Sequence, residues 1–182
     1  SNTLLLESSD YHSKEESFSF ICIEPIIGMK ADKDKFSVLK KGEEISTSTI
    51  DRNFNELFNE FASSIELNCD PEVKSFNGLY GYTTYDSVQY FETIKLNVKD
   101  APSAIPMMQY SFYRFIIAIN HFNDELILIE NIEEGEESKI QEIETIIEAQ
   151  SFNIQKFEIV GEETSNCTND EFKKYVRKLL VM

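Results

Sequence analysis

The first candidate for chemistry is a carboxylate and a hydroxyl that follow an apolar segment near the start of the chain. Glu7 comes directly after Leu4–Leu6 and the Thr3 methyl group, and Ser8 and Ser9 follow it. A strand end that offers both groups suits the ammonium group of an amino acid, because both oxygens accept hydrogen bonds from it. The alternative is a strand that simply ends in solvent, which composition alone favours.

The other catalytic patterns are weak. The two histidines, His12 and His121, form no metal-binding pair at helical spacing. Gly78 and Gly81 lack the flanking residues of a phosphate-binding loop. A nucleophilic pair of Cys22 with either histidine is conceivable, but a buried and inert thiol is the favoured interpretation. We therefore expect no catalytic residue and no metal ligand in this chain.

Charge excludes one class of partner. The net charge is −16, with 17 basic and 33 acidic residues, and nucleic-acid binding needs clustered Lys and Arg. Lys40 and Lys41 are the nearest approach to a basic patch, and Glu43 and Glu44 follow them. The acidic run at 133–137 is interpreted as a charged, solvated stretch, because general acid catalysis needs a carboxyl in a perturbing environment.

Size and cysteine usage favour one cytoplasmic domain. The chain has 182 residues and 41% hydrophobic residues, enough for a single core. We expect no membrane partner, because no apolar run is long enough to span a bilayer. Cys22, Cys69 and Cys167 are too scattered for a disulfide framework or a zinc site, so reduced thiols are expected.

The elements that must position Glu7 and Ser8 are predicted to be strands. Apolar or alternating stretches predict strands near 3–7, 17–23, 26–30 and 36–39, with an interruption at Pro25 and a turn at Lys41-Gly42. A hairpin is predicted from the β-rich runs 113–122 and 125–129, which Asn123-Asp124 separates. A last short strand is predicted at 154–160.

Helical periodicity appears in three places. From Asp51 onward, apolar side chains repeat on one face after N-cap candidates at Ser48 and Thr49; they are Phe54, Leu57, Phe58, Phe61 and Ile65. A second helix has Ile140, Ile143, Ile146 and Ile147 predicted to face inward, with the acidic run at its start. Thr168 and Glu171 have the spacing of a capping box and predict a third helix after a linker at 161–169.

This order of elements predicts an α+β fold of antiparallel β-sheets, sandwich-like and flanked by helices, rather than a parallel α/β fold. The chain begins without Met, and its last helix ends without a cap signal. We therefore expect it to be a piece of a longer protein.

Four motifs, in order, resemble the amino-terminal domain of anthranilate synthase component I. They are Leu5-Leu6-Glu7-Ser8, Phe18-Ser19-Phe20-Ile21 with Glu24-Pro25, Phe76-Asn77-Gly78-Leu79-Tyr80-Gly81-Tyr82 with Tyr85-Asp86, and Ile119-Asn120-His121-Phe122. The junction at 168–176 is also similar. Asn77 stands where the family has its first Gly, and Asn120 replaces an Asp. The basic residue that the family places near Phe18 is missing, and the nearest lysine is Lys14.

The resemblance implies a regulatory domain at 1–166, and at 167–182 a linker and the first helix of a chorismate-binding catalytic domain absent from this sequence. The family is a lyase of tryptophan biosynthesis that makes anthranilate from chorismate and ammonia under feedback inhibition. By resemblance, Leu6, Glu7 and Ser8 bind the inhibitor tryptophan, and Glu7 pairs with its ammonium group. The piece alone is expected to be inactive.

The implied partners are a glutamine amidotransferase subunit, tryptophan as effector, and the chorismate-binding domain of the same chain. Mg²⁺ is implied for the parent enzyme in the absent domain, and no cofactor is implied here. Two alternatives stay open. One is the related domain of aminodeoxychorismate synthase component I, and the other is a free-standing amino-acid-binding or interaction domain.

Overall fold

The structure is a computed structural model that describes residues 3–8, 17–50, 54–94, 96, 105–149, 158, 160–161 and 164–180. The chain divides into two compact units, Ser1–Glu148 and Ala149–Met182. The first unit contains the sheet and is described first.

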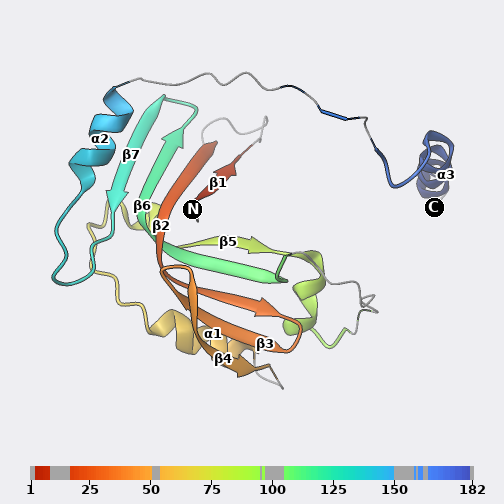
Figure 1. The fold of residues 1–182 in the computed structure, drawn as a ribbon, viewed down its shortest axis with the longest axis horizontal. Coiled ribbons are helices and arrows are strands. Elements are labelled where there is room, and N and C mark those ends of the chain that lie inside the picture. Colours follow the sequence, from red (N-terminus) through yellow and green to blue (C-terminus); the bar gives the residue numbers. More distant parts are fainter. Residues whose placement is uncertain are drawn as a thin grey trace. The chain divides into compact units, whose positions relative to one another are not determined.

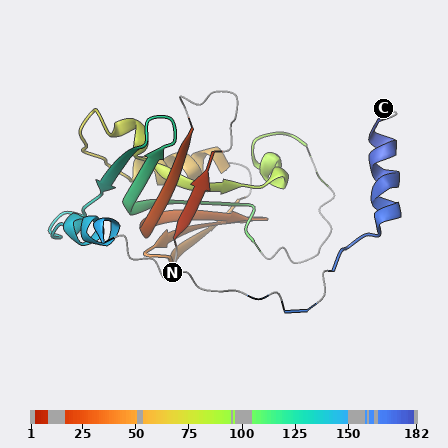
Figure 2. The same ribbon diagram turned by 90° about the horizontal axis from the view of Figure 1, so that it is seen from above.

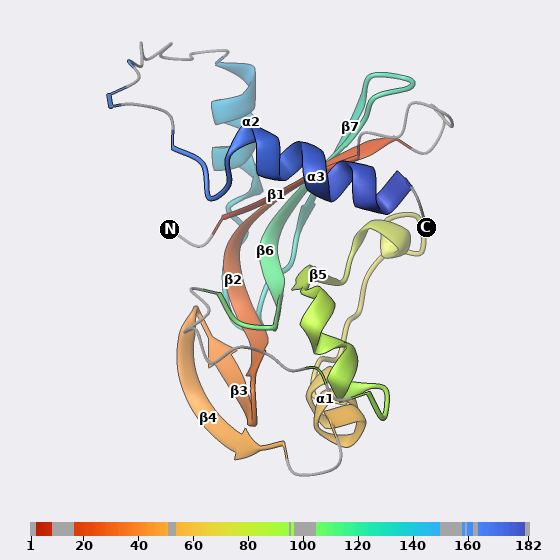
Figure 3. The ribbon, with the colours of Figure 1, turned by 90° about the vertical axis from the view of Figure 1, so that its right-hand side faces the viewer.

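Two long antiparallel strands, β2 (Phe18–Asp32) and β6 (Met108–Asn120), form the spine of this unit. They run side by side and bend together midway (Figure 3), where the register shifts between Pro25 and Ile27. A β-bulge of this kind bends the strand and increases the local twist. The sheet therefore has two halves that share β2 and β6.

Short strands complete each half (Figure 1). Before the bulge, β1 (Leu4–Glu7) pairs with β2, and β7 (Glu125–Glu130) pairs with β6. Beyond the bulge the order is β4-β3-β2-β6-β5, with β3 at Lys35–Lys40, β4 at Glu43–Thr49 and β5 at Leu79–Thr83. Every pairing is antiparallel. The predicted α+β class with antiparallel sheet is confirmed.

Helix α1 (Phe54–Ser63) covers one face of the second half (Figures 1 and 2). Its predicted aromatic stripe is confirmed, because Phe54 and Phe61 are 3% and 4% exposed and pack against Met29 and Phe36 of the sheet. The predicted caps Ser48 and Thr49 are wrong, since both belong to β4. Strand β4 is exposed along its whole length, so it lacks the apolar alternation that signals a half-buried strand.

A second core cluster lies on one face of the first half of the sheet. Cys22, Tyr113, Ile116 and Ile129 are buried there, and Leu4 and Phe20 pack against them. The segment between α1 and β6 contributes to this cluster through a 3₁₀ turn, η2 (Lys74–Phe76), and β5. A second 3₁₀ turn, η3 (Tyr85–Tyr90), places Tyr90 against Phe54.

The hairpin and the second helix are present, with two corrections. The turn between β6 and β7 spans four residues, His121–Asp124, rather than the two predicted. Helix α2 (Ile140–Glu148) has no fully buried residue. Ile140 and Ile143 are half-buried, whereas Ile146 and Ile147 are 69% and 37% exposed, so the predicted inward face is wrong for the second half of the helix. The helix is too short and too peripheral to bury that face on β7. The acidic run at 133–137 precedes the helix instead of forming its first turn.

In the second unit, helix α3 (Asn169–Leu180) begins as predicted. The Thr168 backbone amide donates to Glu171 Oε2 at 2.9 Å, and the Glu171 amide donates to Thr168 Oγ1 at 3.3 Å, which confirms the capping box. The predicted strand at 154–160 lies largely outside the described residues. Across the described segments, no helix has the length and apolarity needed to cross a bilayer.

Candidate functional site

The predicted site residues lie on the edge strand β1. Leu6 is half-buried opposite Phe20, whereas Glu7 is exposed opposite Ser19. Ser8 is exposed just beyond the strand, and its backbone amide donates to the Phe18 carbonyl at 3.1 Å. Successive side chains of a strand alternate between faces, so Leu6 shares the face of Leu4 and Glu7 shares that of Leu5.

The register brings Glu7 close to two residues that the sequence did not single out for this site. Because Ser8 and Phe18 are a hydrogen-bonded pair, Glu7 and Ser19 are a non-hydrogen-bonded pair, in which the side chains of antiparallel strands come closest. Ser19 is 4% exposed, and its Oγ lies 2.7 Å from His121 Nε2. We call Glu7, Ser19 and His121 the polar corner; Ser8 follows Glu7 at the strand end, and by alternation its side chain lies on the face of Leu6.

The polar corner adjoins an apolar sheet face. By register, its strand neighbours on the same side are apolar; they are Leu5, Ile21, Ile23, Phe115, Ile117, Ile119, Leu126 and Leu128. Leu5 is 58% and Leu126 45% exposed. An anionic and hydroxylic corner next to accessible hydrocarbon suits a ligand with an ammonium group and a large apolar group. Lys14 and His12 lie outside the described residues.

The glycine-aromatic motif packs on the opposite face. Phe18 and Phe76 have ring centroids 5.3 Å apart, and Phe20 and Tyr80 are 5.2 Å apart. The Tyr80 hydroxyl donates to the Phe76 carbonyl at 2.6 Å. These aromatic side chains pack on the face of β2 opposite to Ser19.

Asn77, which stands in place of the family's first glycine, has a structural role. Its side-chain amide and that of Asn131 donate to each other at 2.7 and 3.0 Å. Asn131 also donates to the Tyr113 carbonyl at 2.8 Å. The substitution therefore joins the motif to the end of β7.

Cys22 does not form the possible nucleophilic pair with His121, and His12, the other candidate, lies outside the described residues. The Cys22 side chain is fully buried, and burial raises the pKa of its thiol to about 12. His121 bonds Ser19, which points to the face opposite Cys22. The three cysteines are free, as expected. Among the described residues, no group of three or more His, Cys, Asp or Glu side chains is placed to hold a metal ion.

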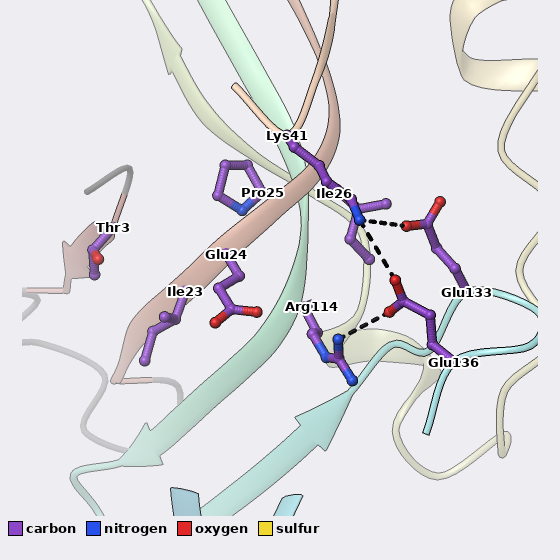
Figure 4. A pocket seen from close by; sticks show the side chains of 9 residues that line it. All are labelled: Thr3, Ile23, Glu24, Pro25, Ile26, Lys41, Arg114, Glu133 and Glu136. Atoms are coloured by element: carbon purple, nitrogen blue, oxygen red, sulfur yellow. Dashed lines mark hydrogen bonds and ion pairs between the residues drawn. The ribbon is translucent and has the colours of Figure 1, made fainter. Parts of the chain in front are cut away.

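A cavity of about 570 Å³ lies at the β2 bulge (Figure 4). One wall is hydrocarbon from β2, and the other is charged. The lining residues are Thr3, Ile23, Glu24, Pro25, Ile26, Lys41, Arg114, Glu133 and Glu136.

Arg114 of β6 organises the charged wall. It donates to Glu130 from Nε and Nη2 at 3.0 Å, to Glu136 from Nη1 at 2.9 Å, and to the Glu137 carbonyl at 2.7 Å. Burial acts to raise the pKa of Glu130. Hydrogen bonds from Ser138, from the Lys139 backbone amide and from Arg114, together with the positive charge of Arg114, outweigh burial and hold this pKa below its usual value. The sequence predicts that Glu136 is a solvated carboxylate. In the structure it accepts a hydrogen bond from Arg114 instead.

Comparison with known proteins finds likeness to solved structures. No protein-family model and no curated protein sequence matches the chain. The crystal structure of anthranilate synthase component I from Streptococcus pneumoniae TIGR4 superposes with a TM-score of 0.55 at 16% sequence identity, over 96% of this chain. The chain shares the fold of the matching part of that enzyme. It spans 39% of the length of that chain, and at this identity the likeness establishes the fold alone.

Proposed function

We propose that the chain is the regulatory amino-terminal domain of an anthranilate synthase component I, and that it binds tryptophan as feedback inhibitor through Glu7 and Ser8. The observation that carries the proposal is the polar corner beside an apolar sheet face, within a fold shared with anthranilate synthase component I over 96% of this chain. The motif residues that resemble that family all lie on strands of this fold or next to them.

The chemistry of the corner fits an α-amino acid. The exposed Glu7 carboxylate accepts hydrogen bonds from the ligand ammonium, and Ser8, the next residue along the edge strand β1, adds a polar contact from the strand end. Ser19 and His121 position the corner, because their bond fixes the hydroxyl that lies next to Glu7. In this proposal the indole lies on the aliphatic face next to Ile21 and Ile119, which are half-buried.

Inhibition in this proposal requires a second domain. A ligand changes activity only if it binds one arrangement of the enzyme more tightly than another. We propose that chorismate, Mg²⁺ and ammonia from a glutamine amidotransferase subunit are handled by the rest of the protein. The domain described here then contributes one wall of the regulatory site and no catalytic group.

The test uses the full-length product of the gene with chorismate, Mg²⁺ and ammonia, and follows anthranilate fluorescence with and without tryptophan. Wild-type activity is expected to fall as tryptophan rises. Glu7→Ala removes a charge-assisted hydrogen bond, so the inhibition constant is expected to rise about 10-fold to 100-fold, and Ser8→Leu is expected to weaken inhibition too. Turnover without tryptophan reports whether each variant is folded.

Glu43→Ala is the matched control, because it removes another exposed strand carboxylate away from the polar corner. Equal tryptophan sensitivity in Glu7→Ala, Ser8→Leu and the control would show that the site is misassigned. Chorismate consumption without anthranilate would instead indicate aminodeoxychorismate synthase, with Glu7 and Ser8 as structural residues.

A further inference from the structure

The bulge in β2 holds one residue in a conformation that needs an explanation. Glu24 has φ = 59°, in the left-handed region that residues other than Gly, Asn and Asp seldom adopt. It also precedes Pro25, and a residue before proline favours extended backbone. Strained residues of this kind persist where the surrounding structure fixes them, and they cluster at functional sites.

The conformation places the Glu24 carboxylate at the cavity, on the side that faces Arg114 (Figure 4). Within the described part of the chain, the Glu24 side chain has no hydrogen bond or ion pair to another residue. The hydrocarbon wall next to it is formed by Ile23, Pro25 and Ile26. A carboxylate without a counter-ion therefore stands at the edge of an apolar surface.

The other charges of the cavity are already balanced. Arg114 bonds Glu136 at 2.9 Å and Glu130 at 3.0 Å. The Lys41 ammonium lies between Glu136 at 3.5 Å and Glu133 at 3.7 Å, and Lys40 lies 3.8 Å from Glu133. An anionic ligand would have to compete with these carboxylates for the two cations. Among the described residues that line the cavity, Glu24 is the charged side chain without a partner, so a cationic ligand can pair with it.

We propose that this cavity is a binding site for a primary ammonium group carried on a short aliphatic chain. The ammonium pairs with Glu24, and the hydrocarbon chain lies on Ile23, Pro25 and Ile26. The cavity volume of about 570 Å³ is within the range of small-molecule sites. The net charge of −16 also raises the local concentration of cations. The site shares Ile23 with the apolar face beside the polar corner but uses a different carboxylate, and it does not depend on the function proposed above.

The test is a titration of the full-length protein with n-butylamine, followed by NMR of labelled isoleucine methyl groups. The Ile23 and Ile26 signals are expected to shift and saturate, while Ile45, exposed on β4, stays unchanged. Butan-1-ol, which has the same chain without the charge, is expected to bind at least tenfold more weakly. A lysine derivative blocked at both ends distinguishes a site for free amines from one that also accepts a lysine side chain of a polypeptide.

Two variants separate binding from folding. Glu24→Gln removes the charge and keeps the shape, and Glu24→Gly removes the side chain while relieving the backbone strain. Both are expected to weaken amine binding at least tenfold, whereas Glu66→Gln, an exposed carboxylate elsewhere, leaves it unchanged. The proposal is overturned if butan-1-ol binds as tightly as the amine, or if the Glu24 variants keep wild-type affinity.

Discussion

Arg114 and Glu130 are an ion pair whose two side chains are almost entirely buried, at 10% and 3% exposed. A buried pair of this kind contributes little relative to a well-packed apolar pair, but removal of one partner leaves a charge in a poor environment. Glu130→Gln is therefore expected to lower the free energy of unfolding at pH 7 by about 3 kcal/mol. Denaturant unfolding of the wild type and the variant measures this difference.

The same variant tests the pKa of Glu130. Its pKa in the folded protein lies below the ordinary carboxyl value, so its contribution to stability is present above about pH 4.3 and is lost as pH falls through the folded pKa. The gap between wild type and Glu130→Gln should narrow at acid pH. Glu125→Gln, at the exposed start of the same strand, should cost under about 0.5 kcal/mol. A gap that stays constant with pH would contradict the assignment.

The pairing of β5 with β6 depends on one glycine of the aromatic motif. A Cβ at Gly81 would collide with the backbone carbonyl of Gln109 and lie 2.7 Å from Tyr110 Cα. Gly81→Ala is therefore expected to force the strands apart and to cost about 3 kcal/mol of unfolding free energy. Chemical denaturation measures the loss.

Gly78, three residues earlier in the same motif, is the matched control. A Cβ there meets nothing within 4 Å, so Gly78→Ala should change stability by under about 0.5 kcal/mol. Equal losses in the two variants would mean that the motif is needed for flexibility rather than for the close approach of β5 to β6.

The charge of the whole molecule lies in its first unit. Residues 1–148 contain 12 of the 17 basic and 28 of the 33 acidic residues, and thus the entire net charge of −16. Repulsion among these negative charges destabilises the compact folded state. We expect the melting temperature to rise by several degrees between about 0.01 M and about 1 M NaCl, where the Debye length falls from about 30 Å to about 3 Å.

Calorimetry measures this effect, and Glu66→Lys, which reduces the net charge at an exposed site, should show a smaller increase. A melting temperature that falls with salt would mean that the ion pairs of Lys40, Lys41 and Arg114 outweigh the repulsion.

The elements that the sequence predicted well are those with a strong local signal. The aromatic stripe of α1 and the capping box of α3 follow from periodicity and spacing within a few residues. Strand β4 was missed and Ser48 was assigned as a cap, because a polar strand paired on an edge has no apolar pattern. The inward face predicted for α2 is wrong at Ile146 and Ile147 for a related reason. Periodicity shows that a helix has an apolar face but not how much of that face another element covers.

By itself, the sequence determined the antiparallel α+β class and the presence of a carboxylate and a hydroxyl at the end of the first strand. Only the tertiary structure decided what lies beside them. Ser19 and His121 join Glu7 through the β1–β2 register and a turn about a hundred residues later, and Glu24 meets the charged wall of Arg114 through the bulge in β2. Such neighbours are set by long-range strand pairing, in which a shift of one residue would turn every side chain to the other face.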